Sequence, residues 1–181
     1  MRLYKKGNKN MVTTIKFTKV REGAIIPSKE VENAGMDIYA CFDEDYIIIP
    51  SHETKLISTG VCSAFDSDYV LVLKERSSTG TKGMGQRAGI IDSGYRGEWF
   101  IPITNHNNKP IVISKKGFDV EEEFSDNGAY GENYIIYPYE KAICQALLLP
   151  VPTTVVEEYT YEELQAIPSK RGKGALGSSG K

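Results

Sequence analysis

Residues 88–97 run Ala88-Gly89-Ile90-Ile91-Asp92-Ser93-Gly94-Tyr95-Arg96-Gly97. The run is a short apolar strand that leads one carboxylate, Asp92, into a glycine-flanked turn with a tyrosine. Asp is a poor strand former and is costly to bury without a partner. Two explanations fit the pattern: an ordinary hairpin turn between two strands, or a turn that presents Asp92 and Tyr95 for chemistry.

Short strands of the same kind fill most of the chain and predict an all-β fold. Segments rich in Ile, Val, Tyr and Thr, separated by turn residues, cover residues 15–20, 46–49, 54–63, 69–74, 89–92, 99–104, 110–114, 134–137 and 143–156. One helix is predicted at residues 161–166, with Thr160 as its N-cap and Glu163 three residues further on. Many short strands at this spacing are typical of a sandwich, a jelly roll or a barrel.

Length and composition predict one β domain with a polar arm. A chain of 181 residues can bury a core without disulfide staples. We expect residues 1–168 to form the domain and residues 169–181, which are poor in apolar side chains, to form a flexible C-terminal arm. The basic residues 1–12 are expected to be a disordered extension, or to precede a start at Met11; the sequence leaves both open.

Charge and residue counts exclude several classes of function. A net charge of −2 disfavours nucleic acid as the direct partner. The three cysteines are isolated and the two histidines lie far from any of them, so neither a zinc site nor a Cys/His nucleophile is supported. No apolar stretch approaches the length needed to cross a membrane. We therefore expect a soluble, cytoplasmic protein.

Three polar clusters interrupt this apolar β pattern. Asp37 breaks a run that otherwise predicts a buried strand, and could also accept backbone hydrogen bonds at a bulge. Arg76, Ser77 and Ser78 follow a strand and offer a cation and hydroxyls that suit anionic oxygens, although a solvated loop would also contain them. The arm repeats this chemistry in residues 171–179, where a flexible linker is the alternative.

Two phosphate-binding signals without a basic stripe indicate a small polyanion such as a nucleoside triphosphate. A carboxylate gains little by facing phosphates of the same sign unless it performs chemistry or binds a metal. The simplest role for Asp92 is that of a general base that activates water beside phosphorus.

Together the clusters resemble the ordered motifs of the trimeric deoxyuridine triphosphatases (dUTPases), including phage members. Five segments match in order: Ala34-Gly35-Met36-Asp37-Ile38-Tyr39-Ala40, Arg76-Ser77-Ser78, Gly89 to Gly97, Lys141-Ala142-Ile143-Cys144-Gln145, and Arg171-Gly172 with Gly177-Ser178-Ser179-Gly180. The resemblance implies a distorted jelly-roll (β-clip) subunit and a homotrimer whose active sites are shared between subunits. It also implies Mg²⁺-assisted hydrolysis of dUTP to dUMP and pyrophosphate, which limits uracil in DNA and supplies dUMP for thymidylate synthesis.

The resemblance assigns a role to each motif. Asp92 would deprotonate the attacking water, and Tyr95 would pack on the deoxyribose where a 2′-hydroxyl would clash. The backbone around Gly89 and Ile91 would recognise uracil. The phosphate donors would be Arg76, Ser77, Ser78 and Gln145, joined from the arm by Arg171, Gly177, Ser178 and Ser179. Asp37 would support the water shell of Mg²⁺.

Departures from the family pattern leave two alternatives. Leu176 stands where an aromatic residue usually stacks on the base, so it offers only apolar contact. The acidic segment 115–133 resembles an insertion between the third and fourth motifs, and could make the protein a dUTPase-like regulator that binds a partner there. A dCTP deaminase is the second alternative, but Pro102 lies near the position where that enzyme needs a glutamate.

Overall fold

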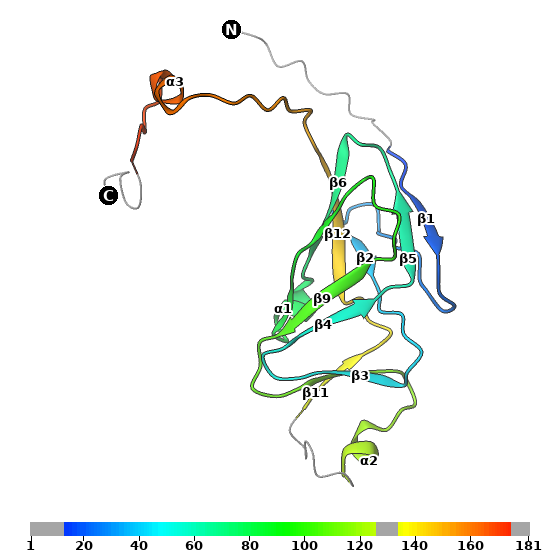
Figure 1. Ribbon diagram of the computed structural model, residues 1–181. Coiled ribbons are helices and arrows are strands. Elements are labelled where there is room, and N and C mark those ends of the chain that lie inside the picture. Colours follow the sequence, from blue (N-terminus) through cyan, green and yellow to red (C-terminus); the bar gives the residue numbers. More distant parts are fainter. Residues whose placement is uncertain (1–12, 126–133, 175–181) are drawn as a thin grey trace. The chain divides into compact units, whose positions relative to one another are not determined.

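The computed structural model describes residues 13–125 and 134–174. The chain divides into two compact units, Met1–Val151 and Pro152–Lys181. The first unit is almost entirely β (Figure 1), with strands β1 (Lys16–Lys19), β2 (Met36–Ile38), β3 (Tyr46–Ile49), β4 (Thr54–Ser58), β5 (Val61–Ala64), β6 (Tyr69–Lys74), β7 (Met84–Gln86), β8 (Ile90–Ile91), β9 (Phe100–Asn105), β10 (Ile111–Ser114), β11 (Ile135–Pro138) and β12 (Cys144–Pro150). Two short helices, α1 (Ser77–Gly80) and α2 (Val120–Ser125), lie in the connections.

The strands form four small sheets in a jelly-roll arrangement, which confirms the predicted all-β class. Their strand orders are β1-β5, β11-β10-β3, β2-β12-β6-β8 and β4-β9-β7. All pairs are antiparallel except β10 with β11, which run parallel. The strands at residues 46–49 and 69–74 match the sequence prediction, whereas the predicted strand 54–63 is divided between β4 and β5 because Gly60 adopts a φ of +67°.

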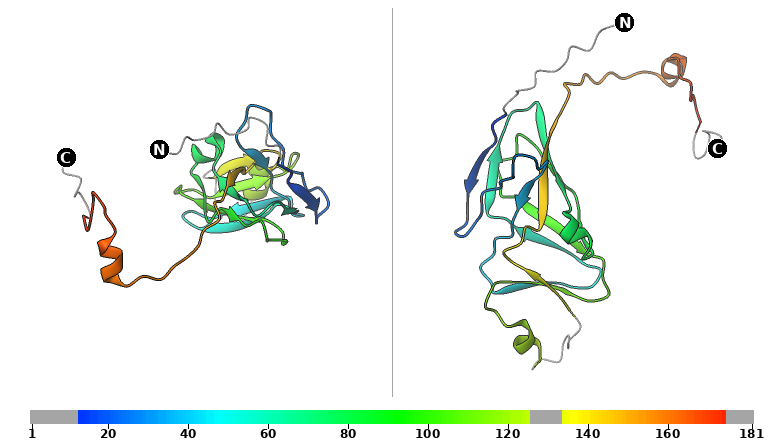
Figure 2. Two further views of the ribbon diagram at one scale, coloured as in Figure 1. Left: turned by 90° about the horizontal axis from the view of Figure 1, so that it is seen from above. Right: turned by 180° about the vertical axis from the view of Figure 1, so that it is seen from behind.

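The four-stranded sheet holds the segments that matter most for the site. Its strand β6 pairs with β12 on one edge and with β8 on the other, and β12 also pairs with β2. Seen from behind in Figure 2, β12 runs alongside β6. The ladder therefore draws segments that are far apart in sequence into one sheet.

The ordinary hairpin turn, one of the two explanations for residues 88–97, does not form. Strand β8 pairs with β6, whereas β9 pairs with β4 and β7 in another sheet. The apolar strands on either side of the glycine-rich turn favoured local pairing, but each pairs with strands from other parts of the chain. Residues 92–98 thus form a crossover between two sheets.

A single large core joins the sheets. Trp99, Tyr137 and a set of isoleucines are fully buried: Ile38, Ile49, Ile57, Ile101, Ile103, Ile111, Ile113 and Ile143. The Trp99 indole packs edge-on against Phe17, with ring centroids 5.5 Å apart. Burial of each such side chain contributes about 1.5–3 kcal/mol, and the crossover 92–98 ends directly on Trp99.

Residues 115–125 leave β10 and pack in a smaller apolar cluster. Phe118 stacks on Tyr46 with ring centroids 4.8 Å apart, and Val120 packs with Val112. The Asp119 carboxylate accepts hydrogen bonds from the amides of Glu121 and Glu122, both at 3.0 Å, and so begins α2. The rest of the acidic segment, residues 126–133, lies outside the described residues.

The second unit contains the predicted helix, α3 (Tyr161–Ala166), with the predicted capping box. The Thr160 hydroxyl accepts from the Glu163 amide at 3.2 Å, and the Glu163 carboxylate accepts from the Thr160 amide at 2.9 Å. Arg171 is exposed, and its side chain donates to the Gly174 carbonyl at 2.9 Å. Four predicted phosphate or base contacts lie outside the described residues: Leu176, Gly177, Ser178 and Ser179. No helix in the described part of the chain has the length and hydrophobicity needed to span a bilayer.

Glu98 fixes the end of the 92–98 crossover. Its carboxylate pairs with Arg21 at 3.0 Å and accepts hydrogen bonds from the Ser58 hydroxyl and, at 3.0 Å, from the Gly60 amide. Burial alone would raise the pKa of this carboxyl, but the hydrogen bonds from Ser58, Gly60 and Arg21 outweigh it and lower the pKa below the ordinary 4.5. The ionised carboxylate therefore stabilises the fold.

We expect Glu98→Gln to lower the free energy of unfolding by about 1 kcal/mol at neutral pH, since charge-assisted hydrogen bonds are lost. Because the folded pKa is depressed, this stabilisation is fully present above about pH 4.5 and disappears as the pH falls through the folded value. Thermal unfolding between about pH 3 and 7 should show a variant less stable than wild type at neutral pH and a difference in stability that vanishes in acid. If the difference in stability between wild type and Glu98→Gln did not depend on pH, the role of the Glu98 charge would be contradicted.

Candidate functional site

One polar pocket of about 480 Å³ gathers the four predicted phosphate donors that lie outside the C-terminal arm. It is lined by Glu32, Asn33, Ala34, Gly35, Asp37, Arg76, Ser77, Ser78 and Gln145. These residues come from the segment leading into β2, from the turn after β6 with helix α1, and from β12. The first, second and fourth sequence motifs therefore meet at one place, as a shared role requires.

Strand register explains this meeting. Gln145 pairs with Asp37 on one side and with Lys74 on the other. The chain then leaves β6 two residues before Arg76 and turns into α1. Three neighbouring strands thus place Asp37, Gln145 and Lys74 side by side. The turn that follows Lys74 carries the Arg76 guanidinium and the hydroxyls of Ser77 and Ser78.

Arg76 and Asp37 form an ion pair at the pocket. Arg76 Nε lies 2.9 Å from Asp37 Oδ1, and Arg76 Nη2 donates to Asp37 Oδ2 at 3.2 Å. Both side chains are about one-third exposed, at 31% and 35%. The two-point contact fixes the plane of the guanidinium while leaving one edge accessible, a geometry that suits binding of an oxyanion.

Thr79 holds the turn that carries Arg76, and sequence analysis missed it. This fully buried hydroxyl accepts from the Arg76 amide at 2.9 Å and donates to the Arg76 carbonyl at 3.0 Å. The segment was considered a loop, but it forms the single helical turn α1. A threonine three residues after Arg76 was the available signal, since a hydroxyl at that spacing can bond the turn's own backbone.

Gln145 is held against Gly35. Its Nε2 donates to the Glu75 carbonyl at 2.9 Å, which fixes the amide at the pocket. A Cβ added to Gly35 would lie 2.5 Å from Gln145 Oε1 and 3.1 Å from its Cβ. Only glycine lets the backbone of the first motif approach the glutamine this closely.

Gly89, just before β8, is hydrogen-bonded to β6. The Gly89 carbonyl accepts from the Leu73 amide at 2.7 Å, and the φ of Gly89 is +104°. A Cβ there would lie 3.0 Å from the Leu73 carbonyl oxygen. Ala88 also has a positive φ, 56°. Position 89 therefore requires glycine, because a side chain there would be both close to β6 and in an unfavourable backbone conformation. The side chain of Ile91 points into the core.

The exposed ring of Tyr95 is oriented by its own turn. The Tyr95 amide donates to the Asp92 carbonyl at 3.0 Å, and its hydroxyl donates to the Glu98 carbonyl at 2.9 Å. A Cβ on Gly97 would overlap the Tyr95 hydroxyl. The glycine lets the ring fold back over the turn and leaves its other face to solvent.

Asp92 and Tyr95 are not in the phosphate pocket of the same chain. Ile91 pairs with Leu71, so the register continued by one residue sets Asp92 beside Val70. Lys74, at the pocket end of β6, is four positions further along, or about 13 Å at the rise of a strand. The structure brings together the first, second and fourth motifs, whereas the third motif lies further along β6.

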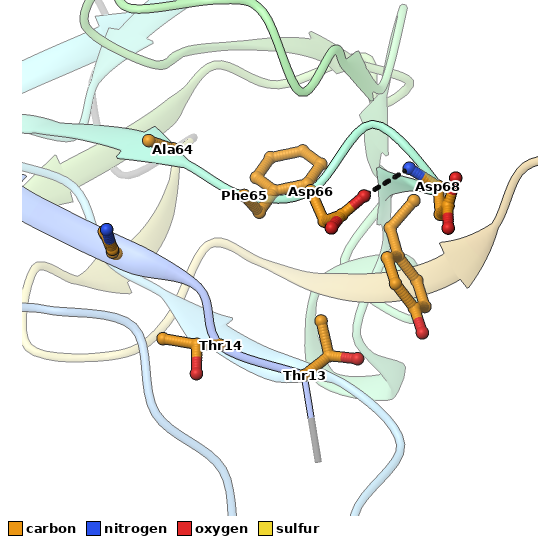
Figure 3. A pocket seen from close by; sticks show the side chains of 8 residues that line it. Thr13, Thr14, Ala64, Phe65, Asp66 and Asp68 are labelled. Carbon is orange, nitrogen blue, oxygen red and sulfur yellow. Dashed lines mark hydrogen bonds between the residues drawn. The ribbon is translucent and has the colours of Figure 1, made fainter. Parts of the chain in front are cut away.

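A second hollow, of about 540 Å³, lies beside β1 and the turn between β5 and β6 (Figure 3). Asp66 and Asp68 face it with Lys16, and the Asp66 carboxylate accepts from the Asp68 amide at 2.9 Å. This hollow has two carboxylates and one ammonium group, so its charge does not favour a polyanion. None of the predicted site residues lines the hollow.

Burial raises the pKa of all three cysteine thiols, which favours the neutral thiol over the thiolate. No three His, Cys, Asp or Glu side chains in residues 13–125 and 134–174 gather closely enough to hold a metal ion by themselves.

Comparison with known proteins gives a consistent family. The dUTPase family model matches residues 21–117, more than half of the chain. A deoxyuridine 5′-triphosphate nucleotidohydrolase of Neisseria meningitidis is 29% identical over 94% of this chain and 98% of its own length. That of Neisseria gonorrhoeae is equally similar.

Solved structures show the same fold. The dUTPase of Staphylococcus bacteriophage 80alpha, solved with dUPNHPP, has a TM-score of 0.70 at 23% identity, covering 93% of this chain and 99% of the phage protein. The EIAV dUTPase has a TM-score of 0.57 at 21% identity, covering 82% of this chain and 98% of the viral protein.

We expect Gly35→Ala to weaken binding of inorganic triphosphate about tenfold, because the added methyl group displaces the Gln145 amide from its bond to Glu75. The chain should still fold, since the side chain that must move is flexible. Titration calorimetry measures the effect. Gly80→Ala is the matched control, because its Cβ would meet only Glu75 Cβ at an ordinary 3.9 Å. Equal affinities for the two variants would contradict the role of Gly35.

Proposed function

The chain belongs to the dUTPase family, and we propose that it hydrolyses dUTP to dUMP and pyrophosphate through attack of water on the α-phosphorus. The observation that carries the proposal is the pocket that gathers Arg76, Ser77, Ser78 and Gln145 from distant parts of the sequence. A guanidinium, two hydroxyls and a carboxamide are the donors that a triphosphate needs. They stabilise the negative charge that moves to the leaving pyrophosphate.

Asp92 is the proposed general base. Its carboxylate is exposed at the end of β8, where it can orient a water molecule and accept its proton. Within one chain it lies too far along β6 to reach a phosphate in the pocket. We therefore infer a homotrimer in which Asp92 of one subunit meets Arg76 of another, so that neither subunit contains a complete site.

Selection of the nucleotide is assigned to the crossover. The Tyr95 ring, fixed by its bond to Glu98, would cover the sugar where a 2′-hydroxyl would clash. The rigid backbone near Gly89 and Ile91 would bind uracil, because an amino group in place of the base carbonyl would meet another donor. With Leu176 in place of an aromatic lid, base selection rests on this backbone more heavily.

Magnesium fits the donors present. Mg²⁺ in phosphate sites is usually bound by one or two carboxylates, waters and the substrate itself. Asp37 supplies one such carboxylate in the pocket, beside the phosphate donors. When bound, Mg²⁺ neutralises phosphate charge. Asp37 then has two roles, since it supports the metal's water shell and orients Arg76.

Residues 169–181 form the proposed phosphate-binding arm. Arg171, with Gly177, Ser178 and Ser179, would add donors to the β- and γ-phosphates and exclude water. Deamination of dCTP is disfavoured, because Pro102 lies in the middle of β9 and offers no proton-carrying group.

Pyrophosphate release from dUTP, dTTP, dCTP, UTP and ATP, with and without Mg²⁺, tests the proposed function. We expect substantial turnover for dUTP alone, and a strong fall without the metal. A protein that hydrolyses dCTP or dTTP as well as dUTP would contradict backbone selection of uracil. Comparable turnover of UTP would remove the role given to Tyr95.

The shared site predicts complementation between two inactive variants. Asp92→Asn should lower turnover about 10²- to 10⁴-fold by removing the base, and Arg76→Ala should weaken substrate binding. If each site takes Asp92 and Arg76 from different subunits, co-refolding equal amounts should restore about one quarter of wild-type activity, the fraction of sites with both residues intact. Mixing without unfolding is the control. Absence of recovery in verified mixed trimers would contradict a shared site.

A further inference from the structure

Tyr137 in β11 is a buried tyrosine that no sequence motif includes. Its side chain is fully buried, and its hydroxyl donates to the Ala142 carbonyl at 2.7 Å. A buried tyrosine usually finds a partner for its hydroxyl, so this bond alone would be unremarkable. This tyrosine is unusual because its acceptor, the Ala142 carbonyl, lies next to a residue of the pocket.

The Ala142 carbonyl also faces Arg76. Arg76 Nη1 lies 3.5 Å from that oxygen, at the long limit of a hydrogen bond, and 3.4 Å from Ser78 Oγ. A carbonyl oxygen has two lone pairs, so it can accept from Tyr137 and Arg76 together. The phenol, the carbonyl and the guanidinium thus form a chain that ends at a residue lining the phosphate pocket.

The Tyr137 hydroxyl must carry its proton to donate to the Ala142 carbonyl. Burial raises the pKa of its phenol, although the hydroxyl of Ser78 and the charge of Arg76 oppose that rise. The phenol therefore stays protonated at neutral pH, as a bond to a carbonyl requires.

We propose that Tyr137 is a positioning residue for triphosphate binding: its hydroxyl occupies and orients the Ala142 carbonyl, and that carbonyl sets the free edge of the Arg76 guanidinium in the pocket. The opposite edge is already fixed by Asp37 at 2.9 and 3.2 Å. With both edges defined, the guanidinium meets the phosphate without reorganisation. The inference rests on the proposed function, because it takes the triphosphate to bind in this pocket.

Loss of the hydroxyl should affect binding more than chemistry. In Tyr137→Phe the buried carbonyl keeps only Arg76 as a nearby donor and competes with the phosphate for it. We expect the affinity for the imido analogue dUpNHpp with Mg²⁺ to fall about three- to tenfold. KM for dUTP should rise by a similar factor with kcat nearly unchanged, as for uniform binding.

Tyr139→Phe is the matched control. Tyr139 lies directly after β11 and packs its ring, edge-on, against Phe42 with centroids 4.9 Å apart, and its hydroxyl neighbours Cys41 and Phe42 rather than Arg76. If the loss of a tyrosine hydroxyl near β11 acted only through stability, neither variant would change the affinity of the folded protein for dUpNHpp. Titration calorimetry with dUpNHpp should instead separate them.

A double-mutant cycle tests whether Tyr137 acts through Arg76. Arg76→Lys removes the planar fork but keeps a charge, so binding stays measurable. In that background Tyr137→Phe should cause no further loss of affinity, whereas a full additional loss would overturn the proposal. Should Tyr137→Phe not fold, Tyr137→4-aminophenylalanine keeps an N–H donor and should retain wild-type affinity; a three- to tenfold loss there would count against the proposal.

The wild-type assay separates the two levels of inference. If the wild-type protein releases no pyrophosphate from dUTP, the proposed function fails and the role of Tyr137 fails with it. If the wild type is active and Tyr137→Phe binds dUpNHpp like Tyr139→Phe, only the role of Tyr137 is overturned.

Discussion

The register of β6 between β12 and β8 is the constraint on which the rest of the molecule depends. Through β12 it aligns Lys74, Gln145 and Asp37 in one row. Through β8 it fixes Gly89 against Leu73 and sends the chain to Asp92 in the opposite direction. A shift by one residue would turn each side chain to the other face and dismantle both groups. The core side chain of Leu71, fully buried, prevents that shift.

The pocket is polar, and its lining contains two carboxylates and one guanidinium. Asp37 neutralises Arg76, and Glu32 adds a second carboxylate at the lining. An ion pair that is one-third exposed contributes little to stability, so its value is geometric: it holds a guanidinium ready for an oxyanion. A triphosphate then needs additional positive charge, which explains why a metal ion and the basic arm are part of the proposed mechanism.

Local patterns predicted local structure well, and failed where partners are distant. Short runs rich in Ile, Val and Tyr between turn residues predicted the strands at 46–49 and 69–74, and Thr160 with Glu163 predicted α3, because these signals act within a few residues. The ordinary hairpin turn considered for residues 88–97 does not form because β8 and β9 pair with strands that no local rule selects. The resemblance to dUTPases identified the motifs, but not the one-turn helix α1, the role of Thr79 or the buried Tyr137. Those depend on which backbone groups are left to satisfy once the chain is folded.

The crossover between two sheets separates the residues proposed to select the sugar from those proposed to bind the phosphates. Residues 92–98 begin at β8, end on the buried Trp99 and are held at Glu98 by three donors, so both ends of the segment that carries Tyr95 are anchored. Discrimination by steric exclusion requires such rigidity, because a wall that yields admits the wrong sugar. Phosphate binding has the opposite requirement, since product must leave. Its donors accordingly lie on a half-open pocket and, in the proposed mechanism, on an arm that can withdraw.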